Sequence, residues 1–215
     1  MRFLTITLLL YLPGIIYPEI CSGQPKEAAN PRLSVEIQAI WKEYNSALLA
    51  NIKIEIKNEC PQEYSALNTR ILQLLDSVQY KFGYPDHDMV GVNVSGEFDK
   101  ILFNYPLAAE RKQAILQKMR EKVLQQKASA DNYAKITDRL MYNKSKSQVY
   151  GTIVSASNIY PDIAEKDLIL SVPGLVDETN TDNKRKEIGL KPLADYLAQF
   201  RKDLALSLSS AKKAD

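Results

Sequence analysis

Apolar residues recur every three or four positions along most of the chain, which is the pattern of amphipathic helices. The longest stripe follows Asn30-Pro31, an N-cap residue with proline at the first helical position, and reaches Ile52. Residues 52–57 alternate with period two, as a strand would, but we interpret them as the continuation of this helix. The same periodicity predicts further helices over residues 61–78, 97–104, 107–127, 177–189 and 191–206, and one from Ser129 or Asp131 to Met141.

Two interruptions of this pattern shape the predicted fold. Gly83-Tyr84-Pro85 ends the second helix, because glycine accepts the left-handed C-cap conformation, and residues 84–96 are predicted to form a loop. Gln148–Val154 and Asp167–Val172 are short, β-branched and bounded by turn residues, which predicts a small β-hairpin or ribbon. We therefore expect a mainly α fold, a single helical domain with a small β-hairpin near the C-terminus. Its predicted parts are a flexible N-terminus at 24–30, the domain at 31–206 and a frayed tail at 207–215.

The first 23 residues predict export. Met1-Arg2 is a short positive region, residues 3–16 are mostly apolar, and Cys21-Ser22-Gly23 offers small residues before a cut ahead of Gln24. That is the layout of a secretory signal peptide, and the apolar run is shorter than the roughly 20 residues of a membrane helix. We expect a secreted or periplasmic protein with no stable membrane insertion after cleavage; an uncleaved N-terminal anchor is the alternative.

Charge and cysteine content narrow the class of partner. The chain has a formal net charge of +2 with 25% charged residues, which gives no concentrated basic face for nucleic acid. After cleavage Cys60 is the only cysteine, so no intramolecular disulfide is possible, and we predict an incidental or structural role for its thiol.

Catalytic options are limited by the histidine content. His87 is the only histidine, which excludes a zinc site built on two histidines, and we predict no metal and no cofactor. Asp86-His87-Asp88 is either a solvated loop, which we favour, or a metal-binding tip or carboxylate-oriented base. Asp138, Asp177 and Glu187 are candidate acids for glycoside chemistry, but the chain has 26 acidic residues, so such a pairing has low specificity.

The most informative polar residues lie between Asp138 and Leu197. Asp138 and Arg139 are predicted at a helix end, followed by a strand whose alternation would put Gln148, Tyr150 and Thr152 on one face. Gly151 within that strand suggests a bulge or a close approach of backbone or ligand. Arg185, on a later helix, could offer a planar fork to a carboxylate. Asp138, Arg139, Gln148, Tyr150 and Arg185 therefore predict either a buried hydrogen-bond network or the wall of a pocket.

This order of residues resembles a bacterial family known as domain of unknown function 6624. The family has an Asp-Arg pair, a Gln-x-Tyr-Gly-Thr-Gln strand, a later arginine, a Gly-Leu-x-Pro-Leu turn and a tyrosine. Asn68 and the segment from Leu74 to Pro85 also resemble it, so the similarity spans roughly residues 60–200. Ile153 replaces the family's second glutamine, and Phe103-Asn104-Tyr105-Pro106 stands where many members have a histidine. The resemblance implies no known chemistry.

Two functions remain open at the level of sequence. The first is a non-enzymatic helical domain that binds a small anionic ligand or an envelope protein through Arg139, Gln148, Tyr150 and Arg185, with Asp138 orienting an arginine. The second is a hydrolase of envelope polymers or peptides, with Asp138 as acid or base and Tyr150 as orienter. The second needs a cleft in which Asp138 is partly buried and its pKa is raised.

Overall fold

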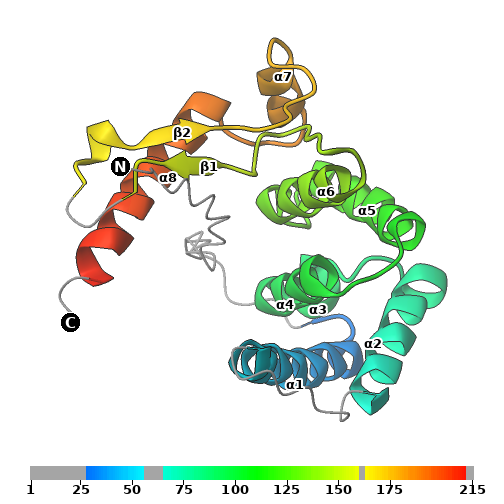
Figure 1. The fold of residues 1–215 in the computed structure, drawn as a ribbon. Helices are drawn as coiled ribbons and strands as arrows, with labels where there is room; N and C mark the ends of the chain where they lie inside the picture. Colours follow the sequence, from blue (N-terminus) through cyan, green and yellow to red (C-terminus); the bar gives the residue numbers. More distant parts are fainter. Residues whose placement is uncertain (1–27, 56–64, 160–162, 212–215) are drawn as a thin grey trace. The chain divides into compact units, whose positions relative to one another are not determined.

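The computed structural model describes residues 28–55, 65–159 and 163–211; the predicted signal peptide, Cys60 and the predicted helix start at Pro61 lie outside them. These ranges contain eight α-helices and one two-stranded sheet, which confirms the mainly α fold with a small hairpin near the C-terminus (Figure 1). The chain divides into two compact units, an N-terminal unit ending at Ile136 and a C-terminal unit starting at Thr137. None of the described helices is both long and apolar enough to cross a membrane.

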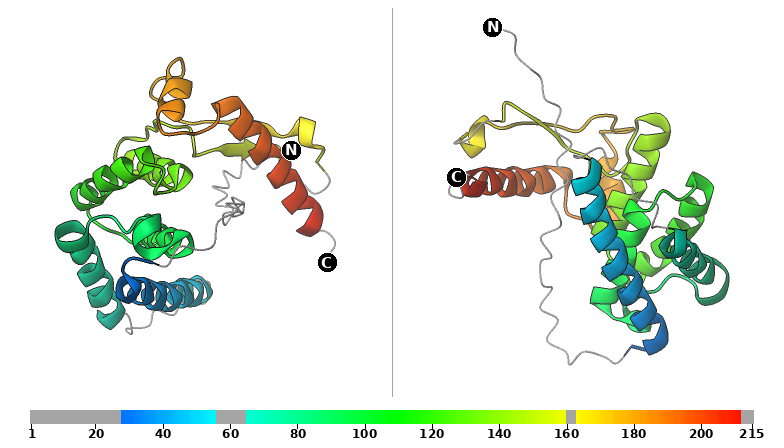
Figure 2. Two further views of the ribbon diagram at one scale, coloured as in Figure 1. Left: turned by 180° about the vertical axis from the view of Figure 1, so that it is seen from behind. Right: turned by 60° about the horizontal axis from the view of Figure 1, so that its bottom comes forward.

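Helix α1 (Pro31–Glu55) begins as the sequence predicts, because the Asn30 side chain accepts a hydrogen bond from the Leu33 amide at 3.1 Å. Its buried stripe keeps three- and four-residue spacing: Leu33, Ile37, Ile40, Tyr44 and Ala47. This face packs against α2 (Ser65–Ser77), α3 (His87–Val90) and α4 (Val92–Asn104), and Figure 2 shows α1 beside α4 from two further sides. Burial of apolar side chains on matching helix faces therefore holds the N-terminal unit together.

The second helix ends near the predicted glycine but in an unexpected form. After Ser77 the chain continues as a π-helix, η1 (Val78–Phe82), and stops at Gly83. The φ of Gly83 is positive at 79°, but its ψ of −172° is extended, so the predicted left-handed C-cap conformation is wrong. Helix α5 (Ala109–Leu124) contacts η1. The remaining core of this unit comes from α2, α4, α5 and the first half of α6 (Ala130–Ser145): Ile71, Leu74, Leu75, Phe98, Ile101, Leu102, Ile115, Met119, Val123, Tyr133 and Ile136.

The predicted loop at residues 84–96 is wrong, because α3 and the first turns of α4 occupy it. Asp86 caps α3 by accepting a bond from the Met89 amide at 2.9 Å, and Gly91, with a φ of 86°, separates the two helices. The α4 start contains two valines and a glycine, which are weak helix formers. Burial of Val94 and Ser95 against the rest of the unit outweighs this low propensity.

The C-terminal unit holds the second half of α6, the hairpin and the last two helices. Strands β1 (Ser155–Ser157) and β2 (Ile169–Ser171) pair antiparallel, with Ala156 opposite Leu170. A short 3-10 turn, η2 (Glu165–Asp167), precedes β2, and α7 (Thr181–Glu187) and α8 (Leu193–Ala211) follow it. In Figure 1 α8 lies along the hairpin, and their shared core is made by Ala156, Ile163, Leu168 and Leu204, with Ile159, Leu170, Phe200, Ala205 and Leu208 packed around it.

Three boundaries in this unit differ from the prediction. Residues 148–154 do not form a strand; β1 starts only at Ser155, and Gln148 makes a single isolated bridge with Leu175. Helix α7 begins at Thr181 rather than at Asp177, and α8 continues to Ala211, beyond residue 206. The first difference matters most, because the segment read as a strand wraps around the side chain of Asp138 instead.

Candidate functional site

Asp138 lies on α6 with its carboxylate enclosed by the segment Gln148–Ile153, which we call the signature loop. The side chain is fully buried. Its Oδ1 accepts bonds from the amides of Val149 at 2.7 Å and Tyr150 at 2.9 Å. Its Oδ2 accepts bonds from both the amide and the hydroxyl of Thr152, each at 2.8 Å. Four donors therefore satisfy both oxygens of this buried carboxyl group.

Gln148, the first residue of the signature loop, holds the loop in place through side-chain hydrogen bonds. The side-chain nitrogen of Gln148, Nε2, donates to the carbonyls of Ile153 at 3.0 Å and Pro173 at 2.6 Å. The side-chain oxygen, Oε1, accepts a bond from the Ile153 amide at 2.9 Å. Its backbone bonds to Gly174 and Val176. The fully buried Gln148 side chain therefore closes the loop on itself and ties it to the segment that precedes α7. Only the main chain of Ile153 takes part, so these bonds do not depend on the side chain at this position.

Arg185 reaches the loop from α7. Its Nη1 donates to the Tyr150 carbonyl and its Nε to the Lys191 carbonyl, both at 2.6 Å, and its guanidinium lies 5.0 Å from the centre of the Tyr196 ring. The Tyr196 hydroxyl in turn donates to the Thr152 carbonyl at 3.2 Å. Arg185 is buried, so its planar fork joins main-chain carbonyls of this chain, where the sequence had suggested a carboxylate.

Two glycines shape the segments that bring these side chains together. At the end of α7 the Gly189 amide bonds to the Lys186 carbonyl and the Leu190 amide to the Arg185 carbonyl, which is a Schellman motif with Gly189 at a φ of 81°. Gly174 has a φ of 72°, and a Cβ there would lie 2.0 Å from the Lys146 carbonyl oxygen. Gly151 also has a positive φ, but the nearest atom to its missing Cβ is the end of the Leu193 side chain. The close approach expected at Gly151 is therefore to a side chain of α8.

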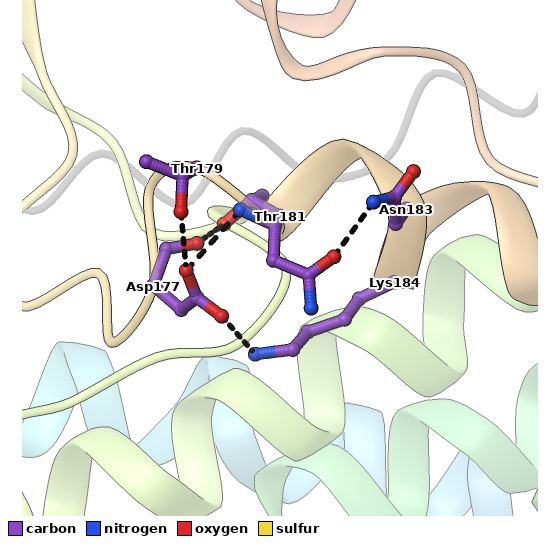
Figure 3. Close-up of polar contacts among 6 residues, drawn as sticks. Asp177, Thr179, Thr181, Asn183 and Lys184 are labelled. Carbon is purple, nitrogen blue, oxygen red and sulfur yellow. Dashed lines mark hydrogen bonds and ion pairs between the residues drawn. The ribbon is translucent and has the colours of Figure 1, made fainter.

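The carboxylate of Asp177 organises the start of α7 (Figure 3). It accepts bonds from the Thr179 hydroxyl at 3.0 Å and the Asn180 amide at 3.2 Å, and it pairs with the Lys184 ammonium at 3.4 Å. These donors, with the Thr179 hydroxyl as the largest contribution, lower the pKa of Asp177. A general acid needs a raised pKa, so the environment of Asp177 opposes that role. Glu187, the other acid considered from the sequence, is exposed on the last turn of α7.

The five predicted site residues thus separate into two groups. Asp138, Gln148 and Arg185 are buried and meet at the signature loop, and the Tyr150 main chain bonds to both Asp138 and Arg185. Arg139 is half-buried on α6. The expectation that Asp138 orients an arginine is wrong, since the carboxylate accepts its hydrogen bonds from the loop. The alternation that placed Gln148, Tyr150 and Thr152 on one strand face does not apply to this irregular segment.

The segment Asp86-His87-Asp88 is not a solvated loop, because it forms the N-cap and the first turn of α3. Asp86 is 3% exposed, caps α3, and pairs with Lys122 at 2.8 Å. Asp88 pairs with Lys127 at 3.0 Å, and the His87 amide donates to the Lys127 carbonyl at 2.8 Å. Both carboxylates therefore fix α3 to the end of α5. Within the described residues no group of three or more His, Cys, Asp or Glu side chains is arranged to hold a metal ion.

Sequence reasoning missed a further buried carboxyl, Asp99 on α4. The Tyr84 hydroxyl donates to its Oδ1 at 2.5 Å and the Asn132 side chain to its Oδ2 at 2.9 Å. A signal was present, because Ser95, Asp99 and Leu102 recur at helical spacing, which puts an acid within the apolar stripe of α4. Tyr84 belongs to Gly83-Tyr84-Pro85, which the sequence predicted as a helix end and as part of the family resemblance.

Comparison of the chain with protein families, with characterised proteins and with solved structures yields no match. The resemblance to family 6624 therefore stays a prediction that depends on the motif residues themselves.

Proposed function

We propose that this chain is an exported, non-catalytic binding domain and that the signature loop supports its binding surface. The observation that carries the proposal is the way in which Gln148–Ile153 is held. The Asp138 and Gln148 side chains accept hydrogen bonds from its amides, and the Arg185 and Tyr196 side chains donate to its carbonyls. Loops fixed on a rigid scaffold are where binding residues concentrate. Asp138, Gln148 and Arg185 would then be positioning residues, and the ligand would contact their less buried neighbours.

The surroundings of Asp138 argue against the hydrolase alternative. A general acid or base must come within hydrogen-bonding distance of the proton that it transfers. Both oxygens of Asp138 are already occupied by the loop, and the side chain is fully buried. Substrate access would require breaking bonds to a charged acceptor, each of which contributes about 1.5–3 kcal/mol to stability.

An anionic ligand is favoured by a cationic strip at the C-terminal end of α6, made by Arg139, Tyr142 and Lys146. Arg139 and Tyr142 lie three residues apart on one side of the helix, and Lys146 is the first residue after it. The Lys146 ammonium lies 5.3 Å from the centre of the Tyr142 ring, and Lys146 is exposed. A guanidinium and an ammonium along one strip suit a carboxylate or phosphate group, which Arg139 can bind through parallel N–H donors.

Titration calorimetry of the mature chain tests this function, with soluble muropeptides as carboxylate probes and glycerol phosphate oligomers as phosphate probes. We expect one class to bind, and Arg139→Ala to weaken binding by about tenfold, a loss of about 1.4 kcal/mol. Lys144→Ala removes an exposed lysine next to the strip and serves as the control for net charge. Failure of the unmodified chain to bind either class, or equal affinity of Arg139→Ala, would contradict the proposal.

Export is a separate part of the proposal and needs its own test. It rests on the layout of residues 1–23, and mass spectrometry of the chain recovered from the envelope or medium measures it directly. We expect a mature N-terminus at Gln24. Recovery of the protein with Met1 in place, attached to membranes, would favour the uncleaved anchor.

A further inference from the structure

The N-terminal unit contains a polar cluster that the proposed binding function does not use. Asp99 on α4 is 2% exposed and joins two other segments of the unit. Tyr84, from the turn before α3, bonds to Oδ1, and Asn132, from the first turns of α6, bonds to Oδ2. Ser95 lies one turn before Asp99 on α4, with its hydroxyl 3.5 Å from that of Tyr84. The carboxyl is thus a shared anchor for three parts of the unit.

Among the described residues, the donors to this carboxyl are the neutral side chains of Tyr84 and Asn132. In the described part of the chain no lysine or arginine forms an ion pair with Asp99, and the nearby acid Asp86 is paired with Lys122. On α4 itself, Glu97 is half-buried and Lys100 lies over the Trp41 ring. A buried ionised carboxylate without a cation is costly, and two hydrogen bonds only partly offset the loss of water.

Burial consequently raises the pKa of Asp99 to about 6, against the opposing effect of the bonds from Tyr84 and Asn132. Burial, together with the neighbouring Asp99, also raises the pKa of Tyr84 well above its usual value, so the phenol stays protonated. The titrating group of the cluster is therefore the carboxyl.

The geometry offers a place for an added proton. A protonated Asp99 must donate a hydrogen bond, and the nearest hydroxyl oxygen is that of Tyr84 at 2.5 Å. Tyr84 can then turn its own proton toward Ser95, whose hydroxyl lies 3.5 Å away and can accept it. One proton taken from water thus reverses the Tyr84–Asp99 bond, and the Asn132 bond to the other oxygen is kept.

We propose that Tyr84, Ser95, Asp99 and Asn132 form a proton-responsive clasp within the N-terminal unit. Uptake of one proton by the Asp99 carboxyl reverses the Tyr84–Asp99 hydrogen bond and removes a buried charge. The segment before α3, α4 and the start of α6 are then held by a neutral network. The N-terminal unit is therefore more stable against unfolding in mild acid than at neutral pH.

Carbon-detected NMR titration of side-chain carboxyls in the full chain tests the clasp. The Asp99 signal is assigned through its β-carbon in the unmodified chain or by its loss in Asp99→Asn. It should titrate with a midpoint near 6. Ser95→Ala removes the acceptor of the turned hydroxyl and should lower this midpoint. Tyr84→Phe removes a donor to the carboxylate and should raise it.

Asp76→Asn provides the control, since Asp76 is an exposed carboxylate of the same unit that pairs with Arg111. It should leave the Asp99 midpoint unchanged. A midpoint at about 4, the value of an ordinary aspartate, would overturn the clasp. An unchanged midpoint in Ser95→Ala would overturn the proposed bond reversal.

Discussion

Thr152 donates two hydrogen bonds to the same oxygen of Asp138, one from its amide and one from its hydroxyl. The other oxygen is bonded to two further amides of the signature loop. One buried carboxylate thereby fixes residues 149–152, which belong to no helix or strand. With four donors on its two oxygens, Asp138 serves the fold as a hydrogen-bond acceptor.

Asp138→Asn should destabilise the chain strongly. The amide can accept bonds with one oxygen, but its nitrogen then faces the Thr152 donors, which are left buried without an acceptor. Unpaired buried groups of this kind cost about 1–3 kcal/mol each, so we expect a loss of about 3 kcal/mol or more in the free energy of unfolding. Urea denaturation followed by circular dichroism measures it. Asp167→Asn, an exposed carboxylate in η2, is the matched control and should change stability by less than about 0.5 kcal/mol.

Arg185→Lys tests whether the fork geometry matters more than the positive charge. Lysine cannot replace the Nε and Nη1 bonds to two separate carbonyls, nor the stacking on Tyr196. We expect a loss of about 2 kcal/mol in unfolding free energy, together with altered NMR shifts at Tyr150 and Lys191. Lys186→Ala, an exposed neighbour on α7, should leave both unchanged. Full retention of stability in Arg185→Lys would mean that charge alone suffices.

Gly174→Ala and Gly189→Ala separate steric conflict from backbone strain. Both glycines have a positive φ, but only at Gly174 would a Cβ meet a main-chain atom, the Lys146 carbonyl oxygen at 2.0 Å; at Gly189 no atom lies within 4 Å. The alanine at 189 should cost about 1–2 kcal/mol from its left-handed conformation. The alanine at 174 should cost more than about 3 kcal/mol, because backbone must move. Thermal unfolding of the two variants side by side gives the comparison, and equal losses would contradict it.

Asp99 predicts an unusual dependence of stability on pH. Its pKa is about 6 in the folded chain against 3.8 for the free side chain, so between these values the folded state binds more protons than the unfolded state. Stability from this group is therefore fully present below about pH 4 and is lost as the pH rises through about 6. A shift of about two pKa units corresponds to about 3 kcal/mol.

The measurement compares urea unfolding of the unmodified chain and Asp99→Asn at about pH 7 and about pH 5. The unmodified chain should gain more stability than the variant when the pH falls, because the neutral asparagine has no charge to remove. Equal changes in the two proteins would show that Asp99 does not titrate in this range.

Helical periodicity predicted α1 well, down to the cap at Asn30, because a long stripe of apolar residues has few alternative ways to be buried. It failed at residues 148–154, where β-branched residues suggested a strand. The structure of that segment depends on Asp138, at least ten positions earlier in the chain, and short-range pattern carries no information about such a partner. The start of α4 was wrongly predicted as a loop for a related reason. Its valines and glycine are weak helix formers, and burial against the rest of the unit makes them helical.

The sequence predicted part of the polar network at the signature loop but not its arrangement. Asp138, Gln148 and Arg185 do come together, and of the two interpretations, network or pocket wall, their burial and hydrogen bonds correspond to the network. The residue types alone could not distinguish a buried network from a pocket wall, because the same polar side chains occur in both. Asp99 was missed because one acid in an apolar stripe gives little signal among 26 acidic residues.

The enclosure of Asp138 has a consequence for how the C-terminal unit exchanges protons with water. The amides of Val149, Tyr150, Thr152 and Ile153 all donate to side-chain oxygens of Asp138 or Gln148, which are themselves buried. In deuterated solvent these four protons should be replaced only when the unit opens, as slowly as those in the middle of α6. A segment without regular secondary structure would thus be among the last parts of the unit to take up deuterium.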